Sequence, residues 1–330
     1  MPVTPLDTKT VVALVREATA APSMHNAQPW RFRYLTERQA LQLSADLERA
    51  MPRSDSVHRG LHLGCGAALF NLRVAAEHTG LEPRVHLLPD AADPQLLADV
   101  RLTARAKGDG AALVALHPAI RRRHTSRYPF ADKEIPEAVR AALSEAARLE
   151  GARLDFPAPW HAQSLLDLVS DAEGRDTLDP RNAEDLNRWT RIGTAEADTA
   201  VDGVPDYAFG PRKWYGGAPV RDFAGRRPVA DRATVTFENT PHLALLSTAQ
   251  DATADWLRAG QALERVLLLA TVHDLATSLT SHALEWPDLR WVARDPRSAT
   301  GFVQMVLRIG YGPQGPATPR RPVREVLDIE

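Results

Sequence analysis

The sequence predicts an α+β protein whose two halves repeat one pattern of helices and short strands. Apolar residues recur at helical spacing over 56–77 and again over 251–273, and short β-leaning segments accompany both runs. The heptapeptides LRVAAEH (72–78) and LLLATVH (267–273) carry Leu, Ala and His in register. This weak repeat supports a duplication, with a first half at 1–110 and a second half at 111–330.

The composition predicts a globular protein that binds neither nucleic acid nor membrane. Of 330 residues, 44% are hydrophobic and 25% are charged, and the formal net charge is -2. No overall charge therefore attracts the chain to nucleic acid or anionic lipid. The most apolar stretch, 266–270, is far too short to span a bilayer, and the first ten residues have no apolar run behind a basic start. We expect a cytoplasmic protein.

The single cysteine, Cys65, excludes an internal disulfide. It lies on the apolar side of a predicted helix, so we favour an inert core residue over a nucleophile. No Cys/His cluster of the zinc-binding kind is present in the sequence.

The first half begins with a helix and a hairpin. Apolar positions over 8–19 fall on one side of a helix. After Trp30, the alternation of RFRYL and LQLSADL around the turn TERQ predicts two paired strands, although 41–47 also fits a helix.

A long core helix follows over 56–77, and Gly80 ends it as a C-terminal cap would. Its GCG (64–66) suggests a dinucleotide-binding loop, but no strand leads into it and no third glycine follows at the required spacing. We interpret these glycines as allowing close helix packing. The segments 84–88 and 99–106 suit adjacent strands of one sheet.

The second half follows a glycine-containing break at 108–110 and again alternates helices with strands. The pattern predicts helices over 111–120, 135–148, 160–170, 181–198 and 251–273, and strands over 153–156, 241–248 and 302–309. The helix over 181–198 would turn Leu186, Trp189, Ile192 and Ala195 inward. The helix over 251–273 is the most apolar, so we expect it to be central.

Periodicity disappears over 199–233, which we call the middle segment. It mixes glycine and proline with Tyr207, Phe209, Trp214, Tyr215 and Phe223. A long loop without regular structure inside a compact domain is usually functional, often as a lid, and its aromatic rings can cover a flat ligand. The alternative is a loop that packs on its own globule or contacts a partner.

The stretch APSMHNAQPWRF (21–32) concentrates polar side chains between two prolines, directly after a helical pattern. An ordinary loop needs only one or two such residues. A rigid loop that holds a polar ligand is one interpretation. A helix end followed by a polar turn and an edge strand is the other.

The cluster RRRHTSRYPF (121–130) is the most basic stretch of the chain. Such a run is usually the solvated end of a helix. Its guanidinium forks and hydroxyl also match the geometry of phosphate oxygens.

Both stretches resemble signatures of the nitroreductase superfamily. Pro22, Ser23, Asn26, Gln28, Pro29 and Trp30 match its Pro-Ser-x-x-Asn-x-Gln-Pro-Trp loop, which meets the ring and ribityl chain of FMN. Arg123, Thr125, Arg127 and Phe130 resemble its Arg-x-Ser-x-Arg segment, which holds the FMN phosphate, but Thr125 replaces the usual Ser and one extra residue precedes Phe130.

The resemblance extends over about 235–327 and includes the pair Gly310-Tyr311. It implies that the residues after the core helix run beneath the flavin and that a basic residue of the tail approaches the phosphate. Arg321 is the best match for that residue, with Arg320 beside it. The implied FMN site comprises Ser23, Met24 (through its backbone), His25, Asn26, Gln28, Arg123, Thr125, Arg127, Leu279, Ser281, His282, Arg320 and Arg321.

Each half lacks the signature that the other half keeps. Nitroreductases are intertwined homodimers with two FMN sites across the interface. This chain resembles such a dimer fused into one polypeptide, the pattern of the Acg family, with a lid insertion at about 199–233. The resemblance implies one FMN per chain and a monomer that is sufficient for the flavin site.

The implied function is a flavin oxidoreductase that passes a hydride from NAD(P)H to FMN and electrons on to a nitro, quinone or related small-molecule acceptor. No catalytic side chain is expected, because the flavin carries the chemistry. Patterns of the Gly-x-Ser-x-Gly and Ser-x-x-Lys kinds are absent from the sequence. The alternative is a protein that sequesters FMN beneath the lid with little or no turnover.

Overall fold

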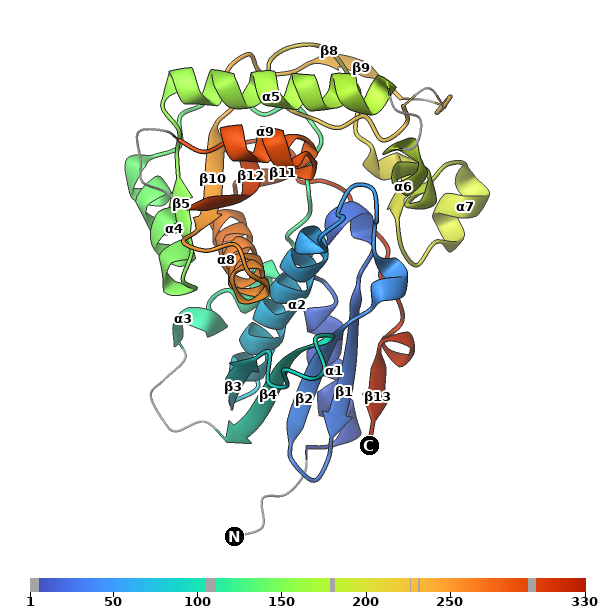
Figure 1. Cartoon of the computed structure of the whole chain (residues 1–330), viewed down its shortest axis with the longest axis vertical. Coiled ribbons are helices and arrows are strands. Elements are labelled where there is room, and N and C mark those ends of the chain that lie inside the picture. Colours follow the sequence, from blue (N-terminus) through green and yellow to red (C-terminus); the bar gives the residue numbers. More distant parts are fainter. Residues whose placement is uncertain (1–5, 105–110, 179–181, 226, 231, 296–300) are drawn as a thin grey trace.

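The computed structural model describes residues 6–104, 111–178, 182–225, 227–230, 232–295 and 301–330. Two long helices, α2 (Arg59–His78) and α8 (Thr253–Val272), cross between two β-sheets (Figure 1). The fold is therefore α+β, as the sequence predicts. The boundary between the halves falls beside 105–110, outside the described residues, and the duplication stays a prediction.

The elements alternate along the chain. The other helices are α1 Thr8–Ala18, α3 Ala111–Val114, α4 Glu137–Leu149, α5 Pro159–Leu178, α6 Asn182–Arg188, α7 Thr194–Thr199 and α9 Pro287–Val292. The strands are β1 Trp30–Leu35, β2 Ala40–Ala45, β3 Leu81–Leu87, β4 Leu96–Ala104, β5 Arg153–Asp155, β6 Thr190–Arg191, β7 Val204–Pro205, β8 Arg212–Tyr215, β9 Thr234–Thr236, β10 Leu243–Thr248, β11 Ala276–Thr280, β12 Phe302–Gly310 and β13 Leu327–Ile329.

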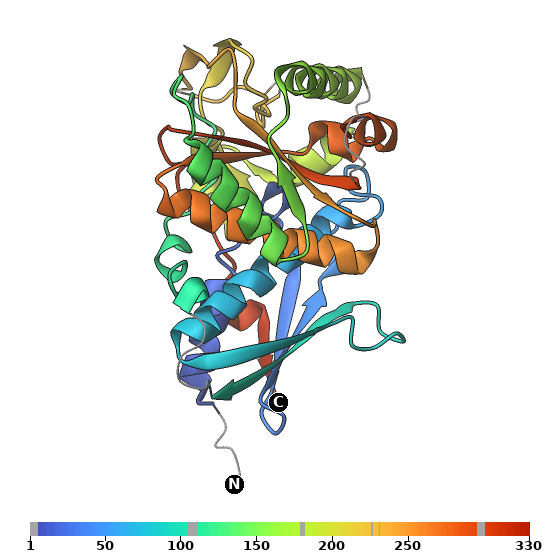
Figure 2. The same cartoon turned by 90° about the vertical axis from the view of Figure 1, so that its left-hand side faces the viewer.

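The first sheet has the strand order β13-β1-β2-β4-β3. Its consecutive strands pair antiparallel, which confirms the predicted hairpin and excludes a helix at 41–47. β13 instead pairs parallel with β1, so the tail of the chain completes the sheet of the first half. Figure 2 shows this sheet on the opposite side of α2 from β10–β12.

Helices α1 and α2 cover one face of the first sheet. Along β1 buried and exposed residues alternate, which places Trp30 and Phe32 against the helices. Helix α1 turns Val11 and Leu14 into the same core, and its N-terminus is capped by Asp7, whose side chain accepts from the Thr10 backbone at 2.6 Å.

Helices α2 and α8 approach so closely that glycines are required at their crossing. A Cβ added to Gly66 would lie 2.3 Å from the Leu257 carbonyl oxygen, and one added to Gly260 would lie 2.2 Å from the Leu63 carbonyl oxygen. The interpretation of the GCG glycines as a packing feature is confirmed at Gly66. The crossing of α2 and α8 therefore sets the position of the two sheets relative to each other.

The second sheet has the order β11-β12-β10-β5. Helices α4 and α8 pack on one face of this sheet, where Leu143 and Leu263 of the helices meet Leu246 and Leu307 of the strands. The other face packs against α5 and α9 (Figure 1). The predicted strands at 153–156, 241–248 and 302–309 and the central helix at 251–273 are confirmed.

Three predicted elements differ from the structure. The single helix over 181–198 is wrong, because Gly193 at φ +90 separates α6 from α7 and β6 pairs with β7. Trp189 is buried as expected, but Ala195 is exposed. Arg181 lies outside the described residues.

The helix predicted over 111–120 is shorter. Regular helix ends at Val114, and the 3-10 turn His117–Ala119 follows, in which Pro118 has no backbone N–H to continue the helix. The helix predicted over 160–170 is longer and runs to Leu178. An Asp171–Arg175 ion pair of 3.0 Å, one turn apart, supports its polar end.

The middle segment is not structureless. β7 pairs with β6, and β8 pairs with β9. Its aromatic rings divide into two sets. Phe209 and Phe223 are buried and stack 5.9 Å apart, whereas Tyr207, Trp214 and Tyr215 are exposed. The first set is packed inside the protein, and of the second set Tyr207 donates a hydrogen bond to the Ala317 carbonyl.

Candidate ligand-binding site

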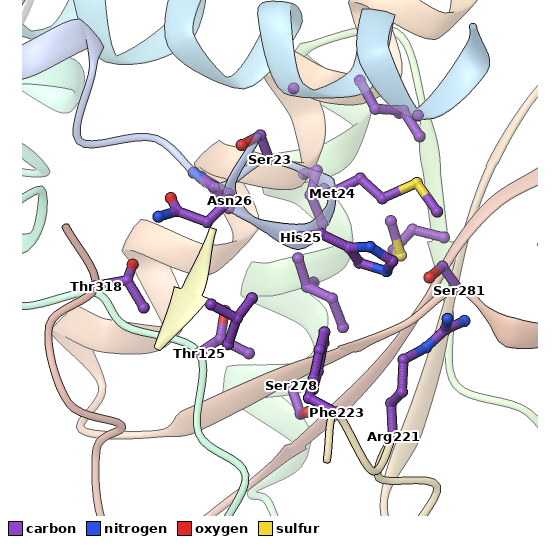
Figure 3. A pocket seen from close by; sticks show the side chains of 18 of the residues that line it. Ser23, Met24, His25, Asn26, Thr125, Arg221, Phe223, Ser278, Ser281 and Thr318 are labelled. Atoms are coloured by element: carbon purple, nitrogen blue, oxygen red, sulfur yellow. The ribbon is translucent and has the colours of Figure 1, made fainter. Parts of the chain in front are cut away.

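One cavity lies where both halves and the middle segment meet. Ten predicted site residues line it: Ser23, Met24, His25, Asn26, Arg123, Thr125, Arg127, Leu279, Ser281 and Arg320. Figure 3 shows Ser23, Met24, His25 and Asn26 on one loop, with Phe223 and Ser278 facing them. Gln28, His282 and Arg321 are not part of the cavity wall, and the reasons follow below.

The loop that carries Ser23 to Gln28 is held in an unusual backbone conformation. His25, Asn26 and Gln28 adopt φ values of 48°, 57° and 54°, a left-handed region that non-glycine residues seldom occupy. The Ser23 hydroxyl accepts a hydrogen bond from the Gln28 backbone at 2.9 Å and closes the loop. Strained backbone of this kind is concentrated at functional sites, which favours the rigid loop over an ordinary polar turn.

Asn26 joins the loop to two distant parts of the chain. Its side-chain amide donates to the carbonyl oxygens of Gly203 at 2.8 Å and Pro319 at 3.0 Å. Its side-chain oxygen accepts from Arg320 at 2.9 Å. The middle segment and the tail are thus both fastened at the edge of the cavity.

Gln28 and Arg321 are structural in this arrangement. The Gln28 amide donates to the Val201 carbonyl at 2.9 Å and its oxygen accepts from the Arg321 backbone at 2.9 Å. The Arg321 side chain lies 3.4 Å from the Asp46 carboxylate and turns away from the cavity. Arg320 lines the cavity and Arg321 does not, which favours Arg320 as the basic residue of the tail, and the assignment stays a prediction.

Arg123 and Arg320 form the first basic group. Arg123 is 3% exposed, and its Nε lies 3.5 Å from the buried Glu264 carboxylate. Arg320 donates to the Thr19 carbonyl at 2.8 Å and the Thr318 hydroxyl at 2.7 Å. Burial, with the charge of Arg123, lowers the pKa of Arg320 to about 9. Arg320 therefore stays cationic at neutral pH, and the Thr19 and Thr318 oxygens to which it donates are uncharged.

Arg127 belongs to a different part of the cavity. It donates to the Ala208 carbonyl at 2.8 Å and lies 4.6 Å above the Phe223 ring. Burial and the charge of Arg221 lower its pKa to about 10. The structure thus groups Arg127 with Arg221 and groups Arg123 with Arg320, so a phosphate shared by Arg123 and Arg127 stays a prediction.

Sequence reasoning missed several lining residues, among them Asp55, Arg59, Arg221, Ser278, Glu285 and Thr318. Arg221 lies in the middle segment and belongs to neither of the two sequence motifs. It pairs with Glu285, which also accepts from the Ser281 hydroxyl at 2.7 Å. Phe223 lines the cavity, as expected for a ring that covers a flat ligand.

Two buried histidines differ in their relation to the cavity. The His25 ring meets the edge of Phe223 at 5.5 Å, and neither ring nitrogen has a hydrogen-bond partner among the described residues. His282 lies behind the wall, with Nε2 3.8 Å from Glu173. Burial and the charge of Arg221 hold the pKa of both histidines well below its usual value, so both are neutral at pH 7.

Within the described residues, no group of three or more His, Cys, Asp or Glu side chains could hold a metal ion. No described helix is long and apolar enough to cross a membrane. Cys65 is buried in the core, and burial raises the pKa of its thiol. The inert role expected for it agrees with this environment.

The protein thus has an α+β fold with an arginine-lined cavity. The family model described as "Nitroreductase family" matches residues 120–311, more than half of the chain. A Mycobacterium tuberculosis (strain H37Rv) protein named "Putative NAD(P)H nitroreductase acg" is 30% identical over 337 residues, with 100% of this chain and 98% of that protein covered. The chain belongs to the nitroreductase family and is of the Acg type.

Further relatives show the same similarity. A second protein of that strain, also named an NAD(P)H nitroreductase with the qualifier "Putative", is 31% identical over 98% of this chain and 92% of its own length. Among solved structures, a "putative nitroreductase" from Anabaena variabilis covers 92% of this chain and 88% of its own, at 13% identity and a TM-score of 0.49. The "FMN and NADPH-dependent nitroreductase NfnB" from Sphigopyxis sp. strain HMH covers 64% of this chain and 97% of its own, at 18% identity and a TM-score of 0.41.

Proposed function

We propose that this protein is a cytoplasmic FMN-dependent oxidoreductase of the nitroreductase type, reduced by NAD(P)H and reoxidised by a nitro, quinone or related acceptor. The observation that carries the proposal is the convergence of a strained polar loop and two arginine groups on one cavity. The relatives named NAD(P)H nitroreductases match the whole chain, which supports the same class of reaction.

The charge balance of the cavity fits FMN. Five arginines and two carboxylates line the wall, and Glu264 behind Arg123 adds a third carboxylate. The wall therefore has a net excess of positive charge in a buried place, where uncompensated charge is costly. A phosphate monoester carries about 1.5 to 2 negative charges near pH 7 and would compensate that excess.

The residues present also supply suitable donors and covers. Arg123, Arg320 and the hydroxyls of Thr125 and Thr318 would hold the phosphate, since guanidinium and hydroxyl groups bind its oxygens. Phe223, which lines the cavity and contacts the His25 ring, would cover the flavin ring. When bound, FMN supplies the redox chemistry by taking a hydride from NAD(P)H and passing two electrons to the acceptor. The chain's own residues would bind and orient the flavin and exclude water from it.

The alternative, an FMN-holding protein with little turnover, is favoured by one observation. The middle segment is hydrogen-bonded to the loop through Asn26 and Gln28. A segment fastened in this way would restrict the access of a hydride donor or an acceptor.

The two functions are separated by spectroscopy of the purified protein. A flavin spectrum with bleaching by NADH or NADPH under anaerobic conditions, followed by recovery with a quinone or nitro compound, is expected for the oxidoreductase. A flavin spectrum without bleaching assigns the holding function instead. Apo-protein that does not bind added FMN rejects both.

A further inference from the structure

A second basic group lies apart from Arg123 and Arg320. Arg59, Arg127 and Arg221 line this part of the cavity with Asp55 and Glu285. Figure 3 shows Arg221 and Ser281 on one side of the cavity and Thr125 and Thr318 on the other. Arg221 therefore lies apart from the threonines that would accompany the phosphate.

Both carboxylates of the second group are already engaged. The Asp55 oxygens accept from the backbone N–H groups of Gly60 and Leu61, both at 2.8 Å, and so cap α2. Glu285 accepts from Arg221 and from Ser281. Three guanidinium groups against two carboxylates leave one positive charge in excess.

The excess charge lies at Arg127. Among the described residues its partners are the Ala208 carbonyl and the Phe223 ring, and no described carboxylate lies within ion-pair distance of it. Arg59 differs, because it donates to the Gln304 and Leu284 carbonyl oxygens inside the protein. Arg127 therefore carries the excess charge, and Arg221, which pairs with Glu285, lines the cavity in the same group.

His25 adds an unused hydrogen-bonding group. Its side chain is 7% exposed, it lines the cavity, and both ring nitrogens lack a partner among the described residues. Buried polar atoms in native proteins are nearly always paired. An unpaired imidazole beside two cations and an aromatic ring therefore indicates a ligand with a flat ring and an anionic oxygen.

We propose that Arg221, Arg127 and His25 form a subsite for a carboxylate on the aromatic ring of the electron acceptor. A guanidinium fork binds a carboxylate through two parallel hydrogen bonds, and Phe223 offers a ring surface beside it. The inference rests on the proposed function, because the acceptor must enter the cavity that holds FMN. It adds a substrate class: acidic nitroaromatic compounds and quinones.

The first test compares 4-nitrobenzoate with 4-nitrobenzamide, which share a ring and a nitro group but differ in charge. The quantity measured is the ratio of their kcat/KM values. In Arg221→Met this ratio is expected to fall about ten- to a hundredfold, since one charge-assisted contact is lost. Arg212→Met removes an exposed arginine of the same segment that does not line the cavity, and the ratio should stay at its wild-type value.

The second test measures binding without turnover. Benzoate is expected to bind the oxidised, FMN-loaded protein more tightly than benzamide, as followed by calorimetry, and to lose this preference in Arg221→Met. If Arg221→Met does not retain FMN, Arg221→Lys replaces it. Lysine keeps the charge without the planar fork and should reduce the benzoate preference by about three- to tenfold.

Three outcomes overturn the inference. They are an unchanged nitrobenzoate ratio in Arg221→Met, equal binding of benzoate and benzamide to the wild type, and an equal loss with both substrates accompanied by a shifted flavin midpoint potential. The last result would assign Arg221 to the flavin itself. Failure of the wild type to bind FMN or to be reduced by NAD(P)H would reject the proposed function instead, so the two failures are distinguishable.

Discussion

Asn26 and Gly203 exchange two hydrogen bonds. The Asn26 side chain donates to the Gly203 carbonyl at 2.8 Å, and the Gly203 backbone N–H donates to the Asn26 carbonyl at 3.2 Å. The loop that the sequence predicts for flavin and the segment that it predicts for a lid are thus directly bonded. Movement of the segment requires these bonds to break.

Asp202, next to Gly203, should control that movement. It pairs with both Arg49 and Arg191, so Asp202→Asn removes two ion pairs at once. If losing these ion pairs weakens the attachment of the middle segment by about 1 kcal/mol, the population of detached segment rises about fivefold. We expect FMN to dissociate about fivefold faster, measured by the fluorescence of released flavin. Asp198→Asn, at an exposed site of the same region, should leave the rate unchanged. Equal rates of FMN dissociation in both variants would show that the Asp202 ion pairs do not hold the segment in place.

Arg320→Ala should weaken FMN binding more than riboflavin binding. Loss of a charged hydrogen-bonding partner costs roughly 1.5 to 3 kcal/mol, or about ten- to a hundredfold in affinity. Arg123→Ala should behave in the same way, whereas Arg321→Ala should not discriminate between the two ligands. Titration of apo-protein with each flavin measures the effect. If the affinity for riboflavin falls as much as the affinity for FMN, these arginines do not bind the phosphate.

His25 should make the apo-protein less stable in acid. Its pKa is depressed in the folded state, so below about pH 6.5 the unfolded chain binds a proton that the folded chain does not, and stability falls as pH falls. Between pH 7.5 and 5.5 a group with an unfolded-state pKa of about 6.5 contributes a loss of at most about 1.4 kcal/mol.

Urea unfolding of wild type and His25→Asn at both values checks this, because Asn tolerates the left-handed backbone. The wild type should lose more stability than the variant between the two pH values, by at most about 1.4 kcal/mol. The same acid loss in both proteins would show that His25 is not the titrating group.

Gly66→Ala should destabilise the protein by roughly 1 to 3 kcal/mol, because its new methyl group meets the backbone of α8. Gly174→Ala is the matched control. Gly174 lies in helix α5 with nothing within 4 Å of an added Cβ, so this change should stabilise by about 0.5 to 1 kcal/mol. Thermal unfolding measures both, and two effects of the same sign would mean that the helices do not meet as described.

One FMN per chain should saturate the protein, and the monomer should suffice. Both motif loops occur once, and residues from both halves line one cavity. Flavin released by denaturation, measured against protein concentration, is expected near one equivalent. The solution mass should be that of a single chain. Two equivalents, or a flavin-bound species found only as a dimer, would contradict the fused-dimer interpretation.

Much of the fold could be predicted because local patterns and tertiary packing agree. The alternation in β1 and the apolar stripes of α1, α2 and α8 all match the faces they bury. The region around Gly193 could not be predicted in this way. A glycine is compatible with a helix locally, and only the pairing of β6 with β7 makes a break there favourable.

The site residues likewise include some that local sequence predicts and some that it does not. Ser23, Asn26, Arg123 and Thr125 occur in compact motifs, so their proximity follows from the local sequence. Arg59 and Arg221 enter the cavity from separate elements, and no spacing connects them. The choice between Arg320 and Arg321 depends on which way the tail turns. The Gln28 hydrogen bond to the Arg321 backbone fixes that turn.

The parallel pairing of β13 with β1 has a consequence for biosynthesis. β1 is made early, but the partner of its free edge and the nearby Arg320 emerge from the ribosome only after nearly all of the described chain. Until then one edge of the first sheet is open, and open edges favour pairing with other chains. The first basic group is likewise incomplete until Arg320 has been made, so the proposed phosphate site forms late in synthesis.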